Sequence, residues 1–224
     1  MKKTIIKICG LMREEDIEKC ILAKADIIGF VVEYPVDVPW NLSVERTKEL
    51  IAYFKECKSR CDSTSECCMV TGGSSEKLLG LLEELSVDYI QLHYKEDVKE
   101  IQSCVDYRKR TGKTFKIIKT IPKKDSLNCV KAYEKAGADI LLLDARTPEN
   151  AAEKSTVFDA GLFLDIKKST GLPVMAAGGI VPENVRKILS DLNPDMIDIM
   201  TGVEEDYGIK SKEKIEMIMK EVAL

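Results

Sequence analysis

Residues 115–144 read FKIIKTIPKKDSLNCVKAYEKAGADILLLD and contain one complete structural unit. Phe115–Lys119 is a short apolar and β-branched run, Asp125–Ala136 has the spacing of an amphipathic helix, and Asp139–Asp144 is a second apolar run. Gly137, which follows the helical segment, is a typical helix stop. Because parallel strands need a long crossover connection, usually a helix, this stretch predicts a strand–helix–strand unit with parallel strands.

The same alternation runs through the whole chain. Strands are predicted at Thr4–Cys9, Asp26–Val32, Cys67–Thr71, Asp88–His93, Phe115–Lys119, Asp139–Asp144, Pro173–Ala176 and Met196–Met200. Helices are predicted at Glu14–Ala25, Ser43–Lys58, Ser74–Ser86, Glu96–Thr111, Asp125–Ala136, Asp159–Thr170, Pro182–Leu192 and Ser211–Val222. Ser43 is a predicted N-cap, Gly171 a predicted helix stop, and Pro182 suits a first helical turn.

Strict strand-then-helix order over 224 residues predicts an α/β protein, a single (β/α)8 TIM barrel that spans residues 1–224 as one domain. An open, doubly wound sheet could use the same alternation. Against it, no Gly-rich fingerprint of a dinucleotide-binding sheet follows the first strand. Nothing in the composition marks a linker or a second domain.

The composition is that of an ordinary globular protein, with 45% hydrophobic and 32% charged residues and a formal net charge of −4. Acidic and basic residues are interleaved, so nucleic acid and anionic membranes are not expected partners. The N-terminus MKKTIIKICG is interrupted by Lys7 and lacks the apolar region of a signal peptide. We therefore expect a cytoplasmic protein, either a monomer or a homodimer.

The chain has eight cysteines, which raises the possibilities of a disulfide framework or a metal site. The lack of an export signal and the apolar surroundings of several cysteines disfavour disulfides. A metal knuckle at Cys57, Cys61, Cys67 and Cys68 is conceivable, but the spacing matches no CxxC pair and the one histidine is distant. We expect reduced thiols in the core or on the surface, and no metal.

In a (β/α)8 barrel the chemistry occurs where the strands end, and Cys9 and Asp144 both stand at predicted strand ends. Cys9 could act as a base or a nucleophile, or be a buried apolar thiol. Asp144 ends an apolar strand, so its charge must face solvent or a polar site, where it could also be only a capping carboxylate. Together they would form an acid–base couple that can move a proton from carbon to a heteroatom without a cofactor.

Two glycine-containing loops follow the predicted seventh and eighth strands, where this fold usually binds phosphate. Gly178 and Gly179 lie in the first loop, and Thr201 and Gly202 in the second. Turns of this kind use glycine anyway, but the two loops together favour a phosphorylated ligand. Among other strand-end residues, His93 could be an acid–base group or a structural histidine. Lys7 and Lys119 are ordinary strand-end cations that could also hold a phosphate or a carboxylate.

These motifs, in this order, resemble the phosphoribosylanthranilate isomerase family from the first strand to the last helix. They are Lys7–Leu11, Gly29–Val32, Asp88–His93, Leu142–Asp144, Phe158-Asp159, Ala177–Val185 and Thr201–Glu204. The resemblance implies an Amadori rearrangement in tryptophan biosynthesis, which converts N-(5-phosphoribosyl)anthranilate to a 1-deoxyribulose phosphate without a metal or redox cofactor. It also implies that Cys9 is the general base at C2, that Asp144 is the general acid at the ribose ring oxygen, and that Gly178, Gly179 and Gly202 bind the phosphate.

Three positions differ from the family pattern. Trp40 stands where the family usually has an arginine close to the anthranilate, Ala152–Ser155 replace Gly-Gly-Thr-Gly, and Tyr94 replaces a glycine. Trp40 could stack on an aromatic ring or a sugar. Arg13 or Arg146 could supply the missing cation as a substrate contact.

Because these changes surround one pocket, two alternatives stay open. The first is an isomerase for another phosphorylated aminosugar or sugar phosphate. The second is a non-catalytic barrel that binds a phosphorylated metabolite or a protein partner. Retention of both Cys9 and Asp144 disfavours the second alternative, because a pure binding protein needs neither residue at these points.

Overall fold

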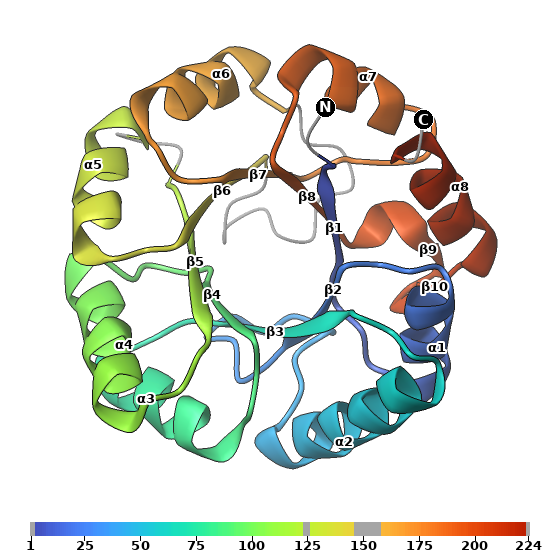
Figure 1. The fold of residues 1–224 in the computed structure, drawn as a ribbon, viewed down its shortest axis with the longest axis horizontal. Helices are drawn as coiled ribbons and strands as arrows, with labels where there is room; N and C mark the ends of the chain where they lie inside the picture. The colour runs from blue at the N-terminus through green and yellow to red at the C-terminus, as the bar shows by residue number, and fades with distance from the viewer. Residues whose placement is uncertain (1–2, 123–125, 146–157, 223–224) are drawn as a thin grey trace.

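The computed structural model describes residues 3–122, 126–145 and 158–222, and its main sheet is a closed barrel of parallel strands (Figure 1). The strands follow chain order around the barrel, and the eighth pairs with the first to close it. Their bounds are β1 (Ile5–Ile8), β2 (Ile27–Val31), β3 (Glu66–Thr71), β4 (Tyr89–Leu92), β5 (Lys116–Thr120), β6 (Ile140–Asp144), β7 (Val174–Ala177) and β8 (Met196–Ile199). The predicted (β/α)8 class is confirmed.

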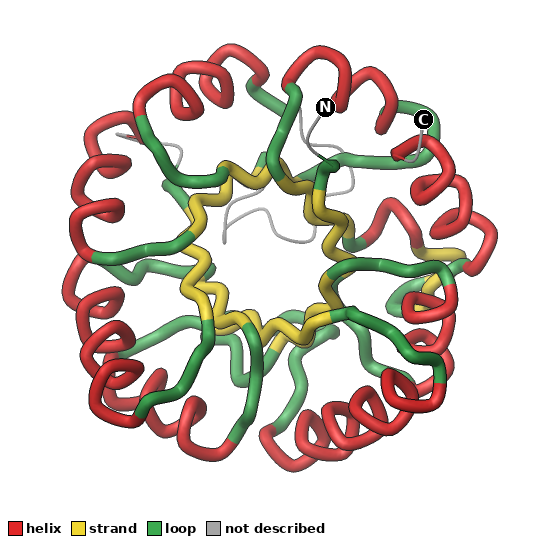
Figure 2. Tube along the Cα trace, in the orientation of Figure 1, coloured by secondary structure: helices red, strands yellow, loops and turns green. Residues whose placement is uncertain are grey.

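A helix follows each barrel strand, and the helices form a ring around the outside of the barrel (Figure 2). Their bounds are α1 (Glu14–Leu22), α2 (Val44–Arg60), α3 (Ser75–Glu84), α4 (Val98–Thr111), α5 (Ser126–Ala136), α6 (Ala160–Ser169), α7 (Val185–Leu192) and α8 (Lys212–Val222). The order of the elements agrees with the sequence patterns throughout, and the boundaries differ by a few residues.

Local chemistry at two helix ends is as predicted. The Ser43 hydroxyl accepts a hydrogen bond from the Arg46 backbone N–H at 3.1 Å, which caps α2. Gly137 follows α5 with φ of +99°, a conformation that glycine adopts with little strain. The chain can therefore turn sharply from α5 into β6.

Gly171 follows α6 as predicted, whereas Pro182 lies before α7 and not in its first turn. The residue that caps the end of α6 is Thr170, in an extended conformation, so Gly171 does not form a left-handed cap. Pro182 lies in the turn before α7, for which Asn184 is the N-cap.

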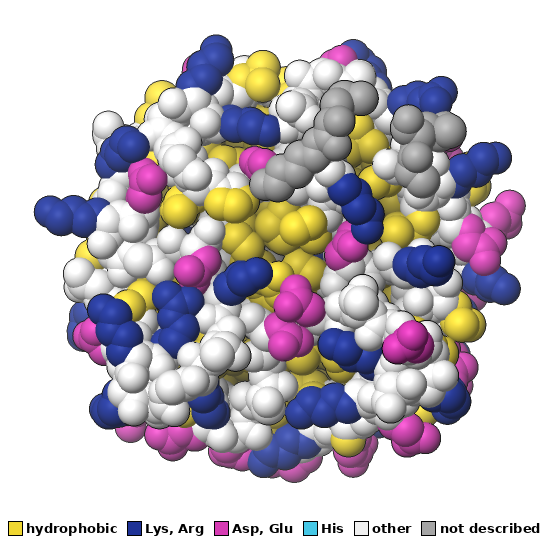
Figure 3. All heavy atoms as spheres, viewed as in Figure 1, with side chains coloured by type: hydrophobic (Ala, Val, Ile, Leu, Met, Phe, Trp, Pro, Cys, Tyr) yellow, Lys and Arg dark blue, Asp and Glu magenta, His cyan; other side chains and the backbone are white. Residues whose placement is uncertain are grey.

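Alternation along the strands separates two apolar layers. One layer fills the barrel and contains Cys9, Ile27, Val31, Cys68, Val70, Tyr89, Ile118, Ile140, Leu142, Met175, Ala177 and Met196. The other contains the outward-facing residues, such as Ile6, Phe30 and Leu141, and packs against the helices. In the view of Figure 3, apolar side chains fill the centre of the barrel, with charged residues of both signs around them. The barrel is therefore a packed core with no open channel in this view.

Most of the cysteines belong to these layers. All eight are free, and Cys9, Cys20, Cys57, Cys67, Cys68 and Cys104 are buried. Cys61 is exposed. Cys67 packs in the outer layer and Cys68 inside the barrel, so the thiols proposed for a metal knuckle face different sides of the sheet. Separately, within the described ranges no helix is long and apolar enough to span a membrane.

The loop after β8 contains elements that the sequence patterns did not predict. A short 3₁₀ helix, η2 (Thr201–Val203), is followed by a hairpin of β9 (Glu204–Asp206) and β10 (Ile209–Lys210). The buried Lys210 ammonium donates to Glu204 Oε1 at 2.9 Å and to the Met200 carbonyl at 3.1 Å. These contacts fix the hairpin to the end of β8.

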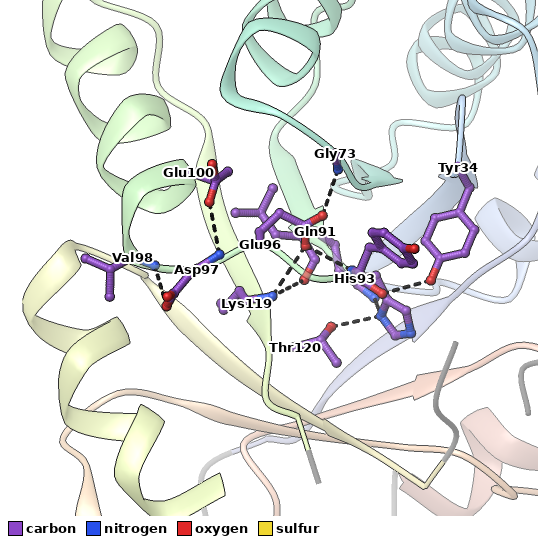
Figure 4. A network of polar contacts seen from close by, with 12 residues as sticks. Tyr34, Gly73, Gln91, His93, Glu96, Asp97, Val98, Glu100, Lys119 and Thr120 are labelled. Atoms are coloured by element: carbon purple, nitrogen blue, oxygen red, sulfur yellow. Dashed lines mark hydrogen bonds and ion pairs between the residues drawn. The ribbon is translucent and has the colours of Figure 1, made fainter. Parts of the chain in front are cut away.

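The Glu96 carboxylate, in the loop after β4, connects the loop after β3 to strand β5 (Figure 4). It accepts hydrogen bonds from the Gly73 N–H at 2.8 Å, the Tyr94 N–H at 2.9 Å and the Lys119 ammonium at 3.4 Å. Lys119 points to the helix side of the barrel and is 1% exposed, so it does not reach a ligand at the mouth. The suggestion that it could hold a phosphate or carboxylate was wrong because strand alternation turns it outward.

Replacing Glu96 with alanine removes these three contacts and leaves a buried ammonium without its carboxylate. We expect Glu96→Ala to lower the free energy of unfolding by about 3–5 kcal/mol. Urea denaturation measures the effect, with Glu83→Ala as the control because Glu83 is exposed on α3. Equal midpoints for the two variants would show that the Glu96 network contributes nothing to stability.

Candidate active site

A pocket opens where the barrel strands end, at the end that the fold rule selects. Its lining comes from seven strands and their following loops: Cys9, Val31, Tyr34, Val38, Trp40, Val70, Gln91, His93, Asp144, Ala177, Gly178, Gly179, Ile180, Asp198, Ile199, Met200, Thr201 and Gly202. Cys9, Asp144 and the two glycine loops, separated widely in sequence, therefore border one cavity.

Cys9 lies immediately after β1 and is 5% exposed. Its N–H donates to the Ile199 carbonyl at 2.9 Å, so the end of β8 fixes the position of this residue. Gly10 follows with φ of +72° and turns the chain away from the pocket. Burial raises the pKa of the Cys9 thiol, and the neighbouring Lys7 ammonium counteracts part of this effect.

Lys7 lies one inward-facing position below Cys9 on β1 and pairs in register with Asp198 on β8. Its ammonium donates to Asp198 Oδ2 at 2.7 Å, and its side chain is fully buried. Burial alone would lower the pKa of Lys7, but the Asp198 carboxylate outweighs burial, and the net pKa is raised. Lys7 is thus a permanent positive charge behind the pocket wall and does not line the cavity itself.

Asp198 is a functional candidate that the sequence patterns did not select. It lines the pocket, and its second oxygen, Oδ1, is buried without a hydrogen-bond partner among the described residues. Gln91, also unselected, lines the pocket with an unpaired Oε1. Both are polar residues at inward positions of otherwise apolar strands, and this signal could have identified them.

Asp144 and His93 meet across the pocket. His93 Nε2 lies 3.5 Å from Asp144 Oδ2, and the two side chains are 21% and 12% exposed. His93 Nδ1 lies 2.8 Å from the Thr120 hydroxyl and 3.0 Å from Gln91 Nε2 (Figure 4). With the Gln91 amide in this orientation Nδ1 is an acceptor, which places the imidazole proton on Nε2, facing Asp144.

The glycine loops after β7 and β8 touch each other. Gly178 and Gly179 have φ of +91° and +69°. A side chain on Gly202 would begin 1.8 Å from the Ile180 carbonyl oxygen, so only glycine fits there. Asn184, whose amide donates to the Gly179 carbonyl at 2.8 Å and accepts from the Val181 N–H at 2.9 Å, fixes the first loop. Gly178, Gly179, Thr201 and Gly202 of these two loops all line the pocket.

Trp40 forms part of the wall on the β2 side. It is 4% exposed and stacks on Tyr207 of the hairpin, with ring centroids 5.3 Å apart and an interplanar angle of 27°. Asn41 holds this loop through hydrogen bonds with the Tyr34 backbone at 2.7 and 2.9 Å. Trp40 is thus at the pocket, as predicted.

The other residues that differ from the family pattern, and the two arginines suggested as substrate contacts, are not among the described residues that line the pocket. Tyr94 does not line the pocket, because it packs edge-on against Tyr34 with centroids 6.2 Å apart. Arg13 pairs with Glu15 at 3.3 Å and does not line it either. Arg146 and Ala152–Ser155 lie outside the described residues. Over the described ranges, neither arginine nor lysine is among the pocket-lining residues.

The same ranges contain no group of three or more histidine, cysteine, aspartate or glutamate side chains arranged to hold a metal ion. The lining therefore supplies a thiol, a carboxylate paired with an imidazole, a second carboxylate and two glycine-containing loops. This set suits proton transfer on a phosphorylated, hydroxylated ligand.

The sole histidine allows a direct test of this electrostatic environment. Burial lowers the pKa of His93 from its ordinary value of 6.5 to about 4, so the ring is neutral at pH 7. Because the unfolded chain binds the proton first, the contribution of His93 to stability declines as pH falls from about 6.5 toward 4. Proton NMR titration of the imidazole should give a single transition near pH 4 when folded and near 6.5 in urea. A folded-state midpoint at the ordinary value would contradict the geometry.

Residues 6–221 match the family described as N-(5'phosphoribosyl)anthranilate (PRA) isomerase. Relatives include N-(5'-phosphoribosyl)anthranilate isomerase 1 of Methanosarcina mazei, 32% identical, with 98% of this chain and 95% of the relative covered. The isomerase of Acinetobacter calcoaceticus is 30% identical, with 98% and 97% covered. The solved structure of phosphoribosyl anthranilate isomerase from Thermotoga maritima has a TM-score of 0.78 at 25% identity, with 98% of each chain covered. The resemblance inferred from the motifs is thereby confirmed, and the chain belongs to the N-(5'-phosphoribosyl)anthranilate isomerase family.

Proposed function

We propose that this chain isomerises N-(5'-phosphoribosyl)anthranilate to the corresponding 1-deoxyribulose 5-phosphate, the Amadori rearrangement of tryptophan biosynthesis. Membership of the family supports this reaction. The observation that carries the proposal is that Cys9, Asp144 and the two glycine loops line one cavity. An acid, a base and an anion site within one cavity are the groups that the rearrangement requires.

Asp144 is the proposed general acid. It donates a proton to the ribose ring oxygen while the bond from that oxygen to C1 breaks and the nitrogen lone pair forms a C1=N bond. The neutral His93 ring, whose Nε2–H faces Asp144 Oδ2 at 3.5 Å, orients this carboxyl group. His93 acts here as a positioning residue. With its pKa lowered to about 4, the ring is not in its protonated, proton-donating form at neutral pH.

Cys9 is the proposed general base. As a thiolate it takes the proton from C2, and the released electron pair forms a C1=C2 bond and neutralises the iminium nitrogen. The resulting enol becomes the ketone when C1 gains a proton and the C2 hydroxyl loses one, so the reaction involves no net oxidation. The Lys7 ammonium favours the thiolate from behind the pocket wall, against the effect of burial.

The loops containing Gly178, Gly179, Thr201 and Gly202 are the proposed phosphate site. Backbone amides bind an anion without a buried cation, and glycine permits the close approach. A phosphate held there would anchor one end of the substrate while C1 and C2 lie near Cys9 and Asp144. Fixing the reacting atoms in this way accounts for a large part of the rate enhancement in such reactions.

A second candidate is isomerisation of another phosphorylated aminosugar. It is favoured by the aromatic wall at Trp40 and by the lack of arginine and lysine among the described lining residues. The same acid–base couple and phosphate loops would serve either substrate. A cytoplasmic location, which the eight free thiols favour, and a monomeric or homodimeric state complete the proposal.

Substitution of the acid and the base tests the reaction directly. We expect Cys9→Ser and Asp144→Asn each to lower kcat by at least about 10²-fold, because each removes one proton transfer. Loss of anthranilate-type fluorescence, with the aldosylamine generated in situ, measures turnover. Cys61→Ser is the matched control, because Cys61 is exposed and distant from the pocket lining. Wild-type turnover no faster than that of the two variants would reject the proposed reaction.

The phosphate site has its own test. Because a methyl group at Gly202 would meet the Ile180 carbonyl, Gly202→Ala should separate the two loops. We expect the variant to bind ribose 5-phosphate at least about tenfold more weakly, seen as a reduced rise in Tm with added ligand. Gly80→Ala is the control, since a side chain there meets nothing within 4 Å. Undiminished protection in Gly202→Ala would place the phosphate elsewhere.

A further inference from the structure

Three side chains in the pocket wall carry buried polar atoms without a hydrogen-bond partner among the described residues. They are Asp198 Oδ1, Gln91 Oε1 and Trp40 Nε1. Such atoms are rare in folded proteins, because loss of water without a replacement bond is unfavourable. Their concentration around one cavity indicates that a ligand supplies the missing partners.

The chemistry of the three atoms differs in a way that suggests which part of a ligand each one binds. Asp198 Oδ1 and Gln91 Oε1 are acceptors, so they match hydroxyl groups, which an open-chain sugar provides. Trp40 Nε1–H can only donate, so it needs an acceptor. Of the strong acceptors on a phosphorylated N-aryl aminosugar, the phosphate is assigned to the glycine loops. The acceptor left for Trp40 is a group on the aromatic ring.

The position of Trp40 fits this assignment. It follows β2 and stacks on Tyr207 of the hairpin after β8, whereas Gly178 and Gly179 follow β7. It belongs to one apolar cluster with Val31, Val38, Val70 and Tyr34, which also line the pocket. This part of the wall suits a planar aromatic group rather than a sugar.

The indole is also held in a fixed orientation. Tyr207 stacks on one face at 5.3 Å, and the Tyr207 hairpin is fixed in turn by the Lys210–Glu204 contact at 2.9 Å. Lys19 adds a hydrogen bond to the Lys210 carbonyl at 2.6 Å. A donor that cannot rotate freely loses little entropy when it binds its acceptor.

We propose that Trp40 is the specificity-determining residue of this site, and that its indole N–H donates a hydrogen bond to the carboxylate of an N-aryl aminosugar phosphate. Tyr207 is the positioning residue that orients the indole. The inference rests on the proposed function for the class of substrate. It adds that a neutral, directional donor recognises the carboxylate without an arginine or lysine from the described pocket lining.

Because Trp40 is the sole tryptophan, its indole N–H gives one cross-peak in a ¹H–¹⁵N NMR spectrum of the unmodified protein. The probes are two inert ligands, the 1-(o-carboxyphenylamino) and 1-phenylamino derivatives of a 1-deoxypentitol 5-phosphate. We expect the carboxylated ligand to move the indole proton downfield and the carboxylate-free ligand to leave it nearly unchanged. Equal shifts with both ligands, or no shift with the carboxylated one, would overturn the proposal.

Kinetics on Trp40→Phe, which keeps an aromatic ring but has no N–H, supply the second measurement. With the anthranilate substrate we expect KM to rise about tenfold while kcat stays within about twofold. This pattern is expected when the lost contact is equally strong in the bound substrate and in the transition state. With the aniline analogue, which lacks the carboxylate, KM should not change. Similar increases in KM for both substrates would show that Trp40 packs against the ligand and does not bind its carboxylate. Wild-type protein that turns over neither substrate, yet shows the carboxylate-dependent indole shift, would reject the proposed reaction and retain this inference.

Discussion

The pairing of Lys7 with Asp198 joins the first and last strands of the barrel, and the geometry of the pocket depends on it. The 2.7 Å contact lies in the register that closes the sheet, one inward position below Cys9. A one-residue slip of β1 against β8 would turn Lys7 toward the helices and leave Asp198 without its partner. Because a buried ammonium without its carboxylate is strongly unfavourable, this pair disfavours such a slip. The same contact that specifies closure therefore places the thiol at the rim and a positive charge beside it.

The charges of the site are arranged so that few of them need to change on ligand binding. Lys7 is already paired, His93 is neutral, and the proposed phosphate loops line the pocket with uncharged residues. The groups left to exchange protons are the Cys9 thiol and the Asp144 carboxyl, which line different parts of the cavity. A site preorganised in this way needs little rearrangement as charge moves from the sugar ring oxygen to C2.

Much of the fold and part of the site could be predicted from the sequence, for identifiable reasons. Each strand and helix has its own periodic signal, and Cys9, Asp144, Gly178 and Gly202 stand at strand ends where the fold rule directs attention. Which side of a strand a residue occupies was harder to judge, so Lys119 was considered although it faces the helices. The partners of a side chain depend on register, and so the Lys7–Asp198 pair could not be predicted.

The hairpin after β8 shows a different limit. Residues 204–210, EEDYGIK, contain no apolar alternation long enough to predict a strand, and the hairpin is held by the buried Lys210 and not by its own propensity. The hairpin affects the pocket through Tyr207, which stacks on Trp40. Tyr207 does not stand at the end of a barrel strand, so the fold rule did not select it. A residue that acts by supporting another can be found only when the contact itself is known.

The two ends of the proposed substrate would be recognised by different means, and this difference accounts for the departure from the family pattern at Trp40. At the proposed phosphate site Gly202 has no alternative, because a side chain there would meet the Ile180 carbonyl. A carboxylate can instead be bound by any suitable donor side chain in the loop after β2. Compared with a guanidinium, an indole N–H has no charge that attracts the carboxylate. Burying the neutral indole in an apolar wall, however, costs far less desolvation free energy. With Asp144 and Asp198 already lining the cavity, a neutral donor discriminates by geometry, and the aromatic stack behind it supplies the rigidity that such discrimination needs.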